Sequence, residues 1–97
     1  MAAGLLTAGL TPAHAHPATP ENLELLRECE SGGNYGANTG NGYYGAYQFS
    51  SETWTGLGYE RLPHQAAPEV QDEAAVRLQS ERGWRAWPAC NRRLRFG

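Results

Sequence analysis

The 97-residue sequence contains no lysine and no isoleucine, and Asp72 is its only aspartate. Its formal net charge of −2 argues against a nucleic-acid partner or an anionic membrane surface, because both attract basic proteins. The sequence has neither a Gly-x-Gly-x-x-Gly string nor a P-loop, so its glycines are expected to serve backbone turns and not phosphate binding. The two cysteines lack a clustered histidine pair, which makes them a poor zinc ligand set. We therefore expect no metal and no cofactor.

The first fifteen residues carry no charged side chain and combine a short apolar run with Ala13-His14-Ala15. An apolar run followed by a small-x-small tripeptide is typical of a secretory signal peptide. The run is too short to span a bilayer, which needs about 20 apolar residues. We interpret residues 1–15 as a signal peptide, truncated at its start if the usual basic residues precede it; a disordered Ala-rich N-terminus is the alternative. Residues 16–20 then form a linker and residues 21–97 a single domain.

The two cysteines predict how so small a domain is stabilised. A domain of this size buries only about 60% of its unfolded surface, so its core alone gives marginal stability. Cys29 and Cys90 form an even count in an exported chain, which favours a disulfide. The long loop between them gives such a bond a contribution of about 4 kcal/mol. Two unrelated thiols are the alternative.

Capping residues and apolar spacing predict three helices and a small irregular lobe. The helices begin after Thr19, after Ser50 or Ser51 and near Pro68, and they end at Gly32-Gly33, at Gly56 or Gly58, and at Gly83. The segment 34–47 is rich in glycine, asparagine and tyrosine, and predicts loops with a small hairpin or an irregular β-element. Residues 84–90 form a compact closing segment, and the arginines at 92, 93 and 95 are expected in a solvated tail. The predicted fold class is α+β, mainly helical, with a minimal β or loop lobe.

Glu30 is the candidate for acid catalysis. It continues the helical stripe of Leu23 and Leu26, where a carboxylate that only needs water is poorly placed. Apolar surroundings raise the pKa of a carboxyl, which keeps it protonated and able to donate a proton to a glycosidic oxygen. The alternative, favoured by periodicity alone, is a solvent-exposed glutamate at a helix end.

The motifs around Glu30 favour the catalytic interpretation. Glu30-Ser31 followed by Gly45-x-x-Gln48 resembles the motif pair of lytic transglycosylases. A wider set of ordered strings resembles the resuscitation-promoting factor catalytic domain of actinobacteria: residues 29–34 (CESGGN), 38–45 (NTGNGYYG), 48–50 (QFS), 53–54 (TW) and 83–90 (GWRAWPAC). The resemblance covers about residues 23–90, nearly the whole predicted mature chain.

The resemblance implies a small lysozyme-like or transglycosylase-like domain with Glu30 as catalytic acid and a Cys29–Cys90 disulfide. It implies a glycan groove around Tyr43, Tyr44, Gln48 and Thr53, and we add Trp84 to these substrate-binding candidates. Each has a structural alternative: the tyrosines and Trp84 could pack in the core, and Gln48 could be a buried amide. Because sugars stack on exposed aromatic faces, we expect at least one of Tyr43 and Tyr44 to be exposed.

Three departures from the family pattern bear on substrate preference. Leu23 stands where the family has a tryptophan in the first helix, which thins the aromatic packing. Arg82 stands where a glutamine usually precedes Gly-Trp, so a polar contact in the groove is lost or replaced by a charge. The loop from Gly58 to Ala67 is shortened.

The sequence also lacks an acid between Glu30 and Glu52. A standard glycosidase needs a second carboxylate about 5–9.5 Å from the acid, and Glu52 suits an exposed first-turn position better. One glutamate fits transglycosylation, in which the muramic 6-hydroxyl attacks and a 1,6-anhydro product forms; hydrolysis stays open. We thus predict a secreted or wall-associated monomer that cleaves the bond between N-acetylmuramic acid and N-acetylglucosamine. The alternatives are a non-catalytic peptidoglycan-binding or signalling module and an interaction domain for another cell-wall hydrolase.

Overall fold

The computed structural model describes residues 16–97, and the predicted signal peptide lies outside them. The first described helix, α2 (Pro20–Ser31), begins and ends where the sequence predicts. The Thr19 hydroxyl accepts a hydrogen bond from the Asn22 backbone N–H at 3.1 Å, which caps the helix. Gly32 adopts a left-handed conformation with a φ of 71° and closes it. The helix buries Leu23 and Leu26, so its apolar stripe faces the core.

The glycine-rich segment forms the predicted small hairpin. Strands β1 (Tyr43–Tyr44) and β2 (Phe49–Ser50) pair antiparallel, with Tyr43 opposite Ser50. Gly45 lies in the turn between them with a φ of 81°, and a Cβ at this position would lie 2.5 Å from the Gln71 side-chain oxygen. Only glycine fits there, because both the conformation and the close approach exclude a side chain.

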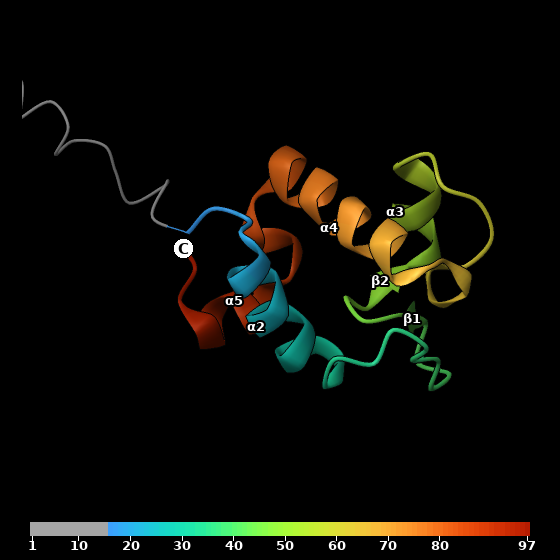
Figure 1. The fold of residues 1–97 in the computed structure, drawn as a ribbon, viewed down its shortest axis with the longest axis horizontal. Helices are drawn as coiled ribbons and strands as arrows, with labels where there is room; N and C mark the ends of the chain where they lie inside the picture. Colours follow the sequence, from blue (N-terminus) through green and yellow to red (C-terminus); the bar gives the residue numbers. More distant parts are fainter. Residues whose placement is uncertain (1–15) are drawn as a thin grey trace, which may run out of the picture.

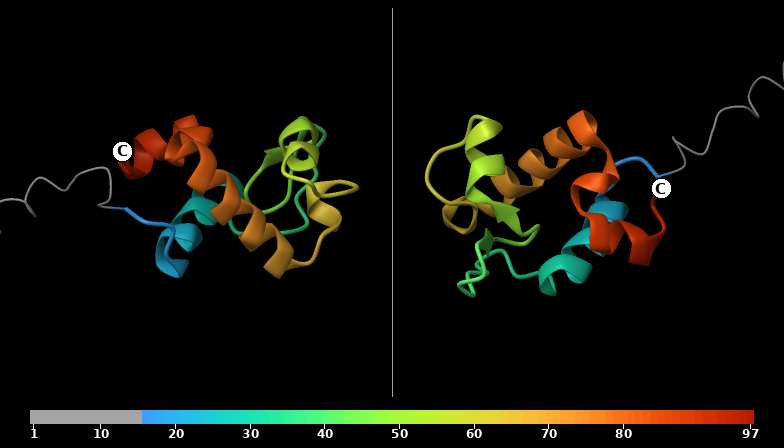
Figure 2. Two further views of the ribbon diagram at one scale, coloured as in Figure 1. Left: turned by 90° about the horizontal axis from the view of Figure 1, so that it is seen from above. Right: turned by 180° about the vertical axis from the view of Figure 1, so that it is seen from behind.

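Two further predicted helices follow the hairpin. Helix α3 (Ser51–Gly56) is capped by Ser50, whose hydroxyl accepts from the Thr53 N–H at 3.2 Å. Helix α4 (Pro68–Arg82) ends at Gly83, and it passes alongside both the hairpin lobe and the helices that hold the chain ends (Figures 1 and 2). Short 3₁₀ turns lie at η2 (Pro63–Gln65) and η3 (Trp84–Ala86).

Aromatic side chains from every part of the domain fill the core. Trp54, Tyr47 and Phe49 are at most 2% exposed, and their rings pack in sequence against one another. Trp87 joins them and donates from its indole nitrogen to the Tyr47 carbonyl oxygen at 3.0 Å. The hairpin lobe and the C-terminal segment therefore share one core.

One prediction about the C-terminus is wrong. Instead of a solvated tail, the chain forms helix α5 (Pro88–Leu94), which begins with a proline at its first turn. Its arginines are exposed, but Phe96 beyond it is 5% exposed and packs on the Trp84 ring at a centroid distance of 4.4 Å. The His16 ring lies against the Phe96 ring at a centroid distance of 5.3 Å, and its Nδ1–H donates to the Phe96 carbonyl oxygen at 3.1 Å. Burial of Phe96 keeps this segment on the domain.

The predicted disulfide is confirmed. Cys29 in α2 and Cys90 in α5 are bonded, with their Cα atoms 5.9 Å apart. The bond joins two helices that also pack against each other side by side (Figure 1). The mainly helical α+β class with a minimal β lobe and one disulfide is confirmed as well.

Candidate active site

Glu30 is the penultimate residue of α2, and its side chain is half-buried. Burial raises the pKa of its carboxyl from 4.5 to about 7, because the surroundings solvate the carboxylate poorly. Among residues 16–97, no arginine side chain lies within 4 Å of this carboxylate to oppose the shift. Glu30 can therefore hold a proton near neutral pH, which a general acid requires.

Both neighbours of Glu30 are fixed. Cys29 is bonded to α5, and the Ser31 hydroxyl donates to the Ala46 carbonyl oxygen at 2.8 Å. The same hydroxyl accepts from the Asn34 N–H at 3.0 Å. The end of α2 is thus attached on one side to the C-terminal helix and on the other to the turn that precedes Gln48.

Three of the predicted substrate-binding residues line one shallow hollow of about 180 Å³. Tyr43 is 50% exposed, as expected for at least one of the two loop tyrosines. Gln48 has a φ of 55° and donates from its side-chain nitrogen to the Gly45 carbonyl oxygen at 3.1 Å. The Thr53 hydroxyl accepts from the Ser50 hydroxyl at 3.1 Å. The other lining residues are Phe49, Ser50, Leu78, Arg82, Ala86 and Trp87.

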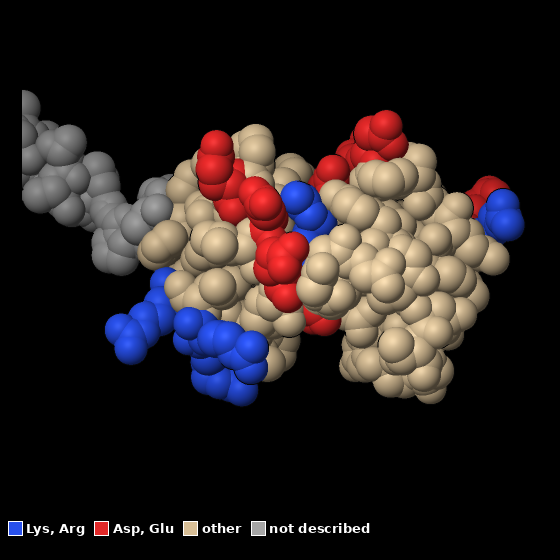
Figure 3. Space-filling view, turned by 60° about the horizontal axis from the view of Figure 1, so that its bottom comes forward, with Lys and Arg blue, Asp and Glu red and all other residues tan. Residues whose placement is uncertain are grey.

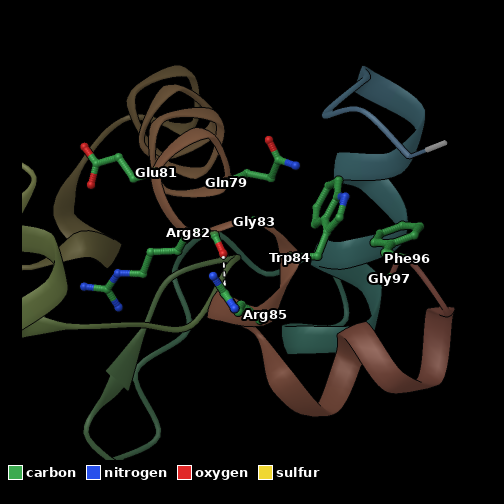
Figure 4. Close-up of a pocket in the computed structure, with 8 residues that line it drawn as sticks. All are labelled: Gln79, Glu81, Arg82, Gly83, Trp84, Arg85, Phe96 and Gly97. Atoms are coloured by element: carbon green, nitrogen blue, oxygen red, sulfur yellow. Dashed lines mark hydrogen bonds between the residues drawn. The ribbon is translucent and has the colours of Figure 1, made fainter. Parts of the chain in front are cut away.

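The remaining predicted site residues lie elsewhere. Tyr44 is half-buried and stacks on the His64 ring at a centroid distance of 5.3 Å. Trp84 is 6% exposed, and its indole nitrogen donates to the His16 carbonyl oxygen. Trp84 therefore packs in the core and borders a different hollow, shown in Figure 4. Glu30 does not line the hollow of Gln48 and Thr53, although Ser31 connects it to that turn.

No aspartate or glutamate lines the hollow of Gln48 and Thr53. Glu52 is exposed in the first turn of α3, as expected. Asp72 accepts hydrogen bonds at one carboxylate oxygen from the hydroxyls of Tyr35 and Tyr47, each at 2.7 Å. Asp72 is therefore part of a hydrogen-bonded cluster, whereas Glu52 is exposed.

The Asp72 cluster is a structural feature that the sequence analysis did not find. Arg27 completes it by donating to the Tyr47 hydroxyl at 2.8 Å, and its guanidinium also lies 3.5 Å from Asp72. Burial and the hydrogen bond to Asp72 raise the pKa of Tyr35 to about 12. The cluster links α2, which carries Glu30, to α4 and to the turn that carries Gln48.

Gln71 is the second residue that the sequence analysis missed. It is fully buried and joins three loops: its oxygen accepts from the Ala46 N–H at 3.0 Å, and its nitrogen donates to the carbonyl oxygens of Tyr35 and Ala66 at 3.1 and 3.0 Å. A signal was present, because Gln71 precedes Ala74, Ala75 and Leu78 by three, four and seven residues, which places it on the buried face of a helix.

Charge is unevenly distributed over the surface. In Figure 3 acidic side chains form a row across one face, and arginines gather beside it near the chain ends. The exposed acids of α2 are Glu21, Glu24 and Glu28, and the exposed arginines at the C-terminus are Arg92, Arg93 and Arg95.

No group of three potential metal ligands occurs within residues 16–97. In the same part of the chain, no helix is long and apolar enough to cross a membrane.

The comparisons with known proteins agree with the motifs. Residues 17–90 match the model of the Transglycosylase-like domain family. The chain is 47% identical over 92 residues to resuscitation-promoting factor RpfC of Mycobacterium tuberculosis, covering 93% of this chain and 66% of that protein. It is 44% identical over 92 residues to resuscitation-promoting factor Rpf of Micrococcus luteus, covering 95% of this chain and 41% of that protein.

A third relative, resuscitation-promoting factor RpfE of Mycobacterium tuberculosis, is 41% identical over 86 residues, which cover 84% of this chain and 50% of that protein. The chain thus spans between 41% and 66% of the length of these curated relatives. The predicted lysozyme-like or transglycosylase-like fold class is confirmed by the family match and by the mainly helical structure. Because that match extends from residue 17 to residue 90, the chain belongs to the transglycosylase-like domain family and is similar to the resuscitation-promoting factors.

Proposed function

We propose that this domain is a secreted muralytic enzyme that cleaves the β-1,4 bond between N-acetylmuramic acid and N-acetylglucosamine in peptidoglycan. The observation that carries the proposal is Glu30, a half-buried carboxyl at a helix end whose pKa is raised to about 7. Family membership supports a role on the glycan strand. The relatives are named resuscitation-promoting factors, which supports a contribution to resuscitation; we propose that wall remodelling during recovery from dormancy is the means.

The chemistry needs one carboxyl acting twice. Protonated Glu30 donates its proton to the glycosidic oxygen as the bond from that oxygen to the muramic C1 breaks, which leaves positive charge on the sugar ring. The Glu30 carboxylate then accepts the proton of the muramic 6-hydroxyl while that oxygen bonds to C1. The product is a 1,6-anhydro sugar, and Glu30 is protonated again. One observation supports this route over one with a second carboxylate: no acid lies between Glu30 and Glu52 in the sequence, and Glu52 is exposed in the first turn of α3.

The groove assignment completes the proposal. Tyr43, Gln48 and Thr53 contact the glycan, with the exposed Tyr43 ring as a stacking surface for a sugar. Tyr44 acts through its stacking on His64, which holds the strand that carries Tyr43. We assign no substrate contact to Trp84, because its indole is buried and hydrogen-bonded.

Mass spectrometry of products from purified wall tests the proposal. The expected result is soluble muropeptides that end in anhydro-muramic acid, each lighter by one water than the hydrolysis product. Fragments that end in a reducing muramic acid would instead identify a hydrolase. If the protein binds the wall but releases no fragments, the enzyme proposal fails and a non-catalytic binding or signalling module takes its place.

A further inference from the structure

Arg82 is the last residue of α4 and lies on the boundary between two hollows. It lines the hollow of Tyr43, Gln48 and Thr53, and it also lines the one bordered by Trp84, Arg85 and Phe96. Figure 4 shows its side chain extended away from Arg85, toward the same side of the view as Glu81. The guanidinium is therefore at the edge of the proposed glycan groove.

This guanidinium has no carboxylate partner in the described chain. The ion pair present among residues 16–97 joins Arg27 to Asp72, so no acidic side chain lies within 4 Å of Arg82. The neighbouring Arg85 is a second cation, and its Nε donates to the Arg82 backbone carbonyl oxygen at 3.1 Å. The groove edge thus carries an exposed and uncompensated positive charge, in a domain whose formal net charge is −2.

We propose that Arg82 is a specificity-determining residue that selects glycan strands with a free carboxylate on the muramic acid substituent. The inference rests on the proposed function, because it assumes that the hollow of Gln48 and Thr53 binds the glycan. The N-acetylated sugar rings are neutral, so they offer hydrogen-bond acceptors to the guanidinium but no negative charge to compensate its own. The planar guanidinium binds a carboxylate through two parallel hydrogen bonds, whereas a neutral amide offers only one acceptor oxygen.

The carboxylate has two chemical sources. One is the lactyl carboxylate of muramic acid, which is free only where the stem peptide has been removed. The other is the set of carboxylates on an attached stem peptide, which amidation neutralises. Both present the same group to Arg82, and matched fragments distinguish them.

A structural explanation for Arg82 also exists, because a cation in the last turn of a helix interacts favourably with the helix dipole. That role would affect thermal stability and would be retained by lysine. It would not make binding depend on a carboxylate in the ligand. The experiment therefore compares Arg82→Gln with Arg82→Lys and measures ligand preference as well as melting temperature.

Fragment binding is measured by NMR titration in a Glu30→Gln background, which prevents turnover during the titration. Three disaccharide fragments are used: one with a free lactyl carboxylate, one with an acidic stem peptide and one with the same stem amidated. At low salt we expect one or both carboxylate fragments to bind about three- to tenfold more tightly than the amidated one. The preference should shrink at high salt, because the charge is exposed.

Arg82→Gln should remove the preference, so that the carboxylate fragments bind no more tightly than the amidated one. Arg82→Lys should keep only part of it. Arg93→Gln is the matched control, because this exposed arginine on α5 lines neither hollow, and it should keep the full preference. Equal binding of all three fragments by the starting protein, or an unchanged preference in Arg82→Gln, would overturn the inference.

Wall turnover by protein with Glu30 intact is measured in parallel. If no wall is cut but the carboxylate preference depends on Arg82, the proposed enzyme function fails and the specificity inference stands. If the wall is cut but the preference is absent or independent of Arg82, the inference fails alone.

Discussion

The half of the domain that holds Glu30 and the lobe that forms the groove are stabilised in different ways. Glu30 lies at the end of α2, which is bonded to α5 by Cys29–Cys90 and buries apolar side chains. The groove lobe has strands of only two residues; Tyr47, Phe49 and Trp54 join it to the aromatic core, and its loops are held by polar contacts, chiefly those of the buried Gln71. A disulfide and apolar packing thus hold the end of α2, whereas hydrogen bonds from one buried side chain to the backbone hold the loops of the hairpin lobe.

The sharpest test of this comparison is Glu30→Gln, which keeps the side-chain shape and removes the transferable proton. General acid catalysis contributes typically 10²–10⁴-fold, so wall turnover should fall by at least about a hundredfold. Stability should stay level or rise, because the desolvated carboxyl is replaced by a neutral amide. Release of soluble muropeptides and thermal melting measure the two effects.

Glu24→Gln is the control for this change. Glu24 is exposed on the same helix, and its replacement should leave both turnover and stability nearly unchanged. Near-normal wall cleavage by Glu30→Gln would remove Glu30 from the mechanism.

Removing the disulfide should destabilise the domain as a whole, because the bond spans 61 residues of the chain. In a Cys29→Ser/Cys90→Ser double variant we expect the free energy of unfolding to fall by about 4 kcal/mol, because the unfolded chain is no longer cross-linked. Urea denaturation measures the loss, and thiol titration of the wild-type protein should detect no free cysteine. An unchanged midpoint in the double variant would show that packing of α2 on α5 suffices without the bond.

The groove half is tested by Gln71→Leu. This change leaves the Ala46 N–H and the carbonyl oxygens of Tyr35 and Ala66 without their partner, which should cost about 3 kcal/mol in total. Hydrogen exchange should show faster opening at Ala46, while amides in the middle of α2 remain protected.

Gln79→Leu on the same helix is the control for Gln71→Leu, because Gln79 is only half-buried and makes none of these bonds. Equal loss of protection in α2 and at Ala46 would mean that the two halves unfold as one unit and are not stabilised separately.

The raised pKa of Glu30 predicts how stability depends on pH. Because the folded protein holds this proton more tightly than the unfolded chain, the stability it contributes is fully present below about pH 4.5 and is lost as pH rises through about 7. The loss should be on the order of 2–3 kcal/mol. Glu30→Gln should remove this part of the pH profile, measured by urea denaturation at several pH values. Turnover should fall over the upper part of the same range, since the protonated form is needed. If the stability of Glu30→Gln depends on pH in the same way as that of the wild type, the Glu30 carboxyl is solvated in the folded protein.

The sequence predicted most of the elements because their signals are local. Thr19 and Gly32 bound α2 by capping and by backbone conformation, and Ser50 does the same for α3. The ordered motifs identified Glu30 and the cysteine pair. Contacts between distant segments could not be predicted, because they depend on how the segments pack and not on local sequence. The hydrogen bonds from Gln71 to distant backbone groups are one example, and those from Tyr35 and Tyr47 to Asp72 are another.

The prediction of a solvated C-terminal tail was wrong for a related reason. Arginines at 92, 93 and 95 dominate the local composition, and the single Phe96 that holds the segment on the core does so through contacts with Trp84 and His16. The aromatic residues of the groove and the core look alike in sequence. Only the packing separates the exposed Tyr43 from the buried Trp84.

The smallest expected effect is at Thr53, and it tests whether the hollow of Gln48 and Thr53 is a groove. Thr53→Ala removes a hydroxyl but keeps the backbone N–H that Ser50 caps, so stability should change by less than about 1 kcal/mol. Loss of one hydrogen bond to the glycan should lower turnover about five- to tenfold. Thr55→Ala is a matched control, because Thr55 is exposed on the same helix and outside the hollow. If Thr53→Ala unfolds the domain, Thr53 has a structural role. If its turnover equals that of Thr55→Ala, the glycan does not contact Thr53, and the hollow is not the proposed groove.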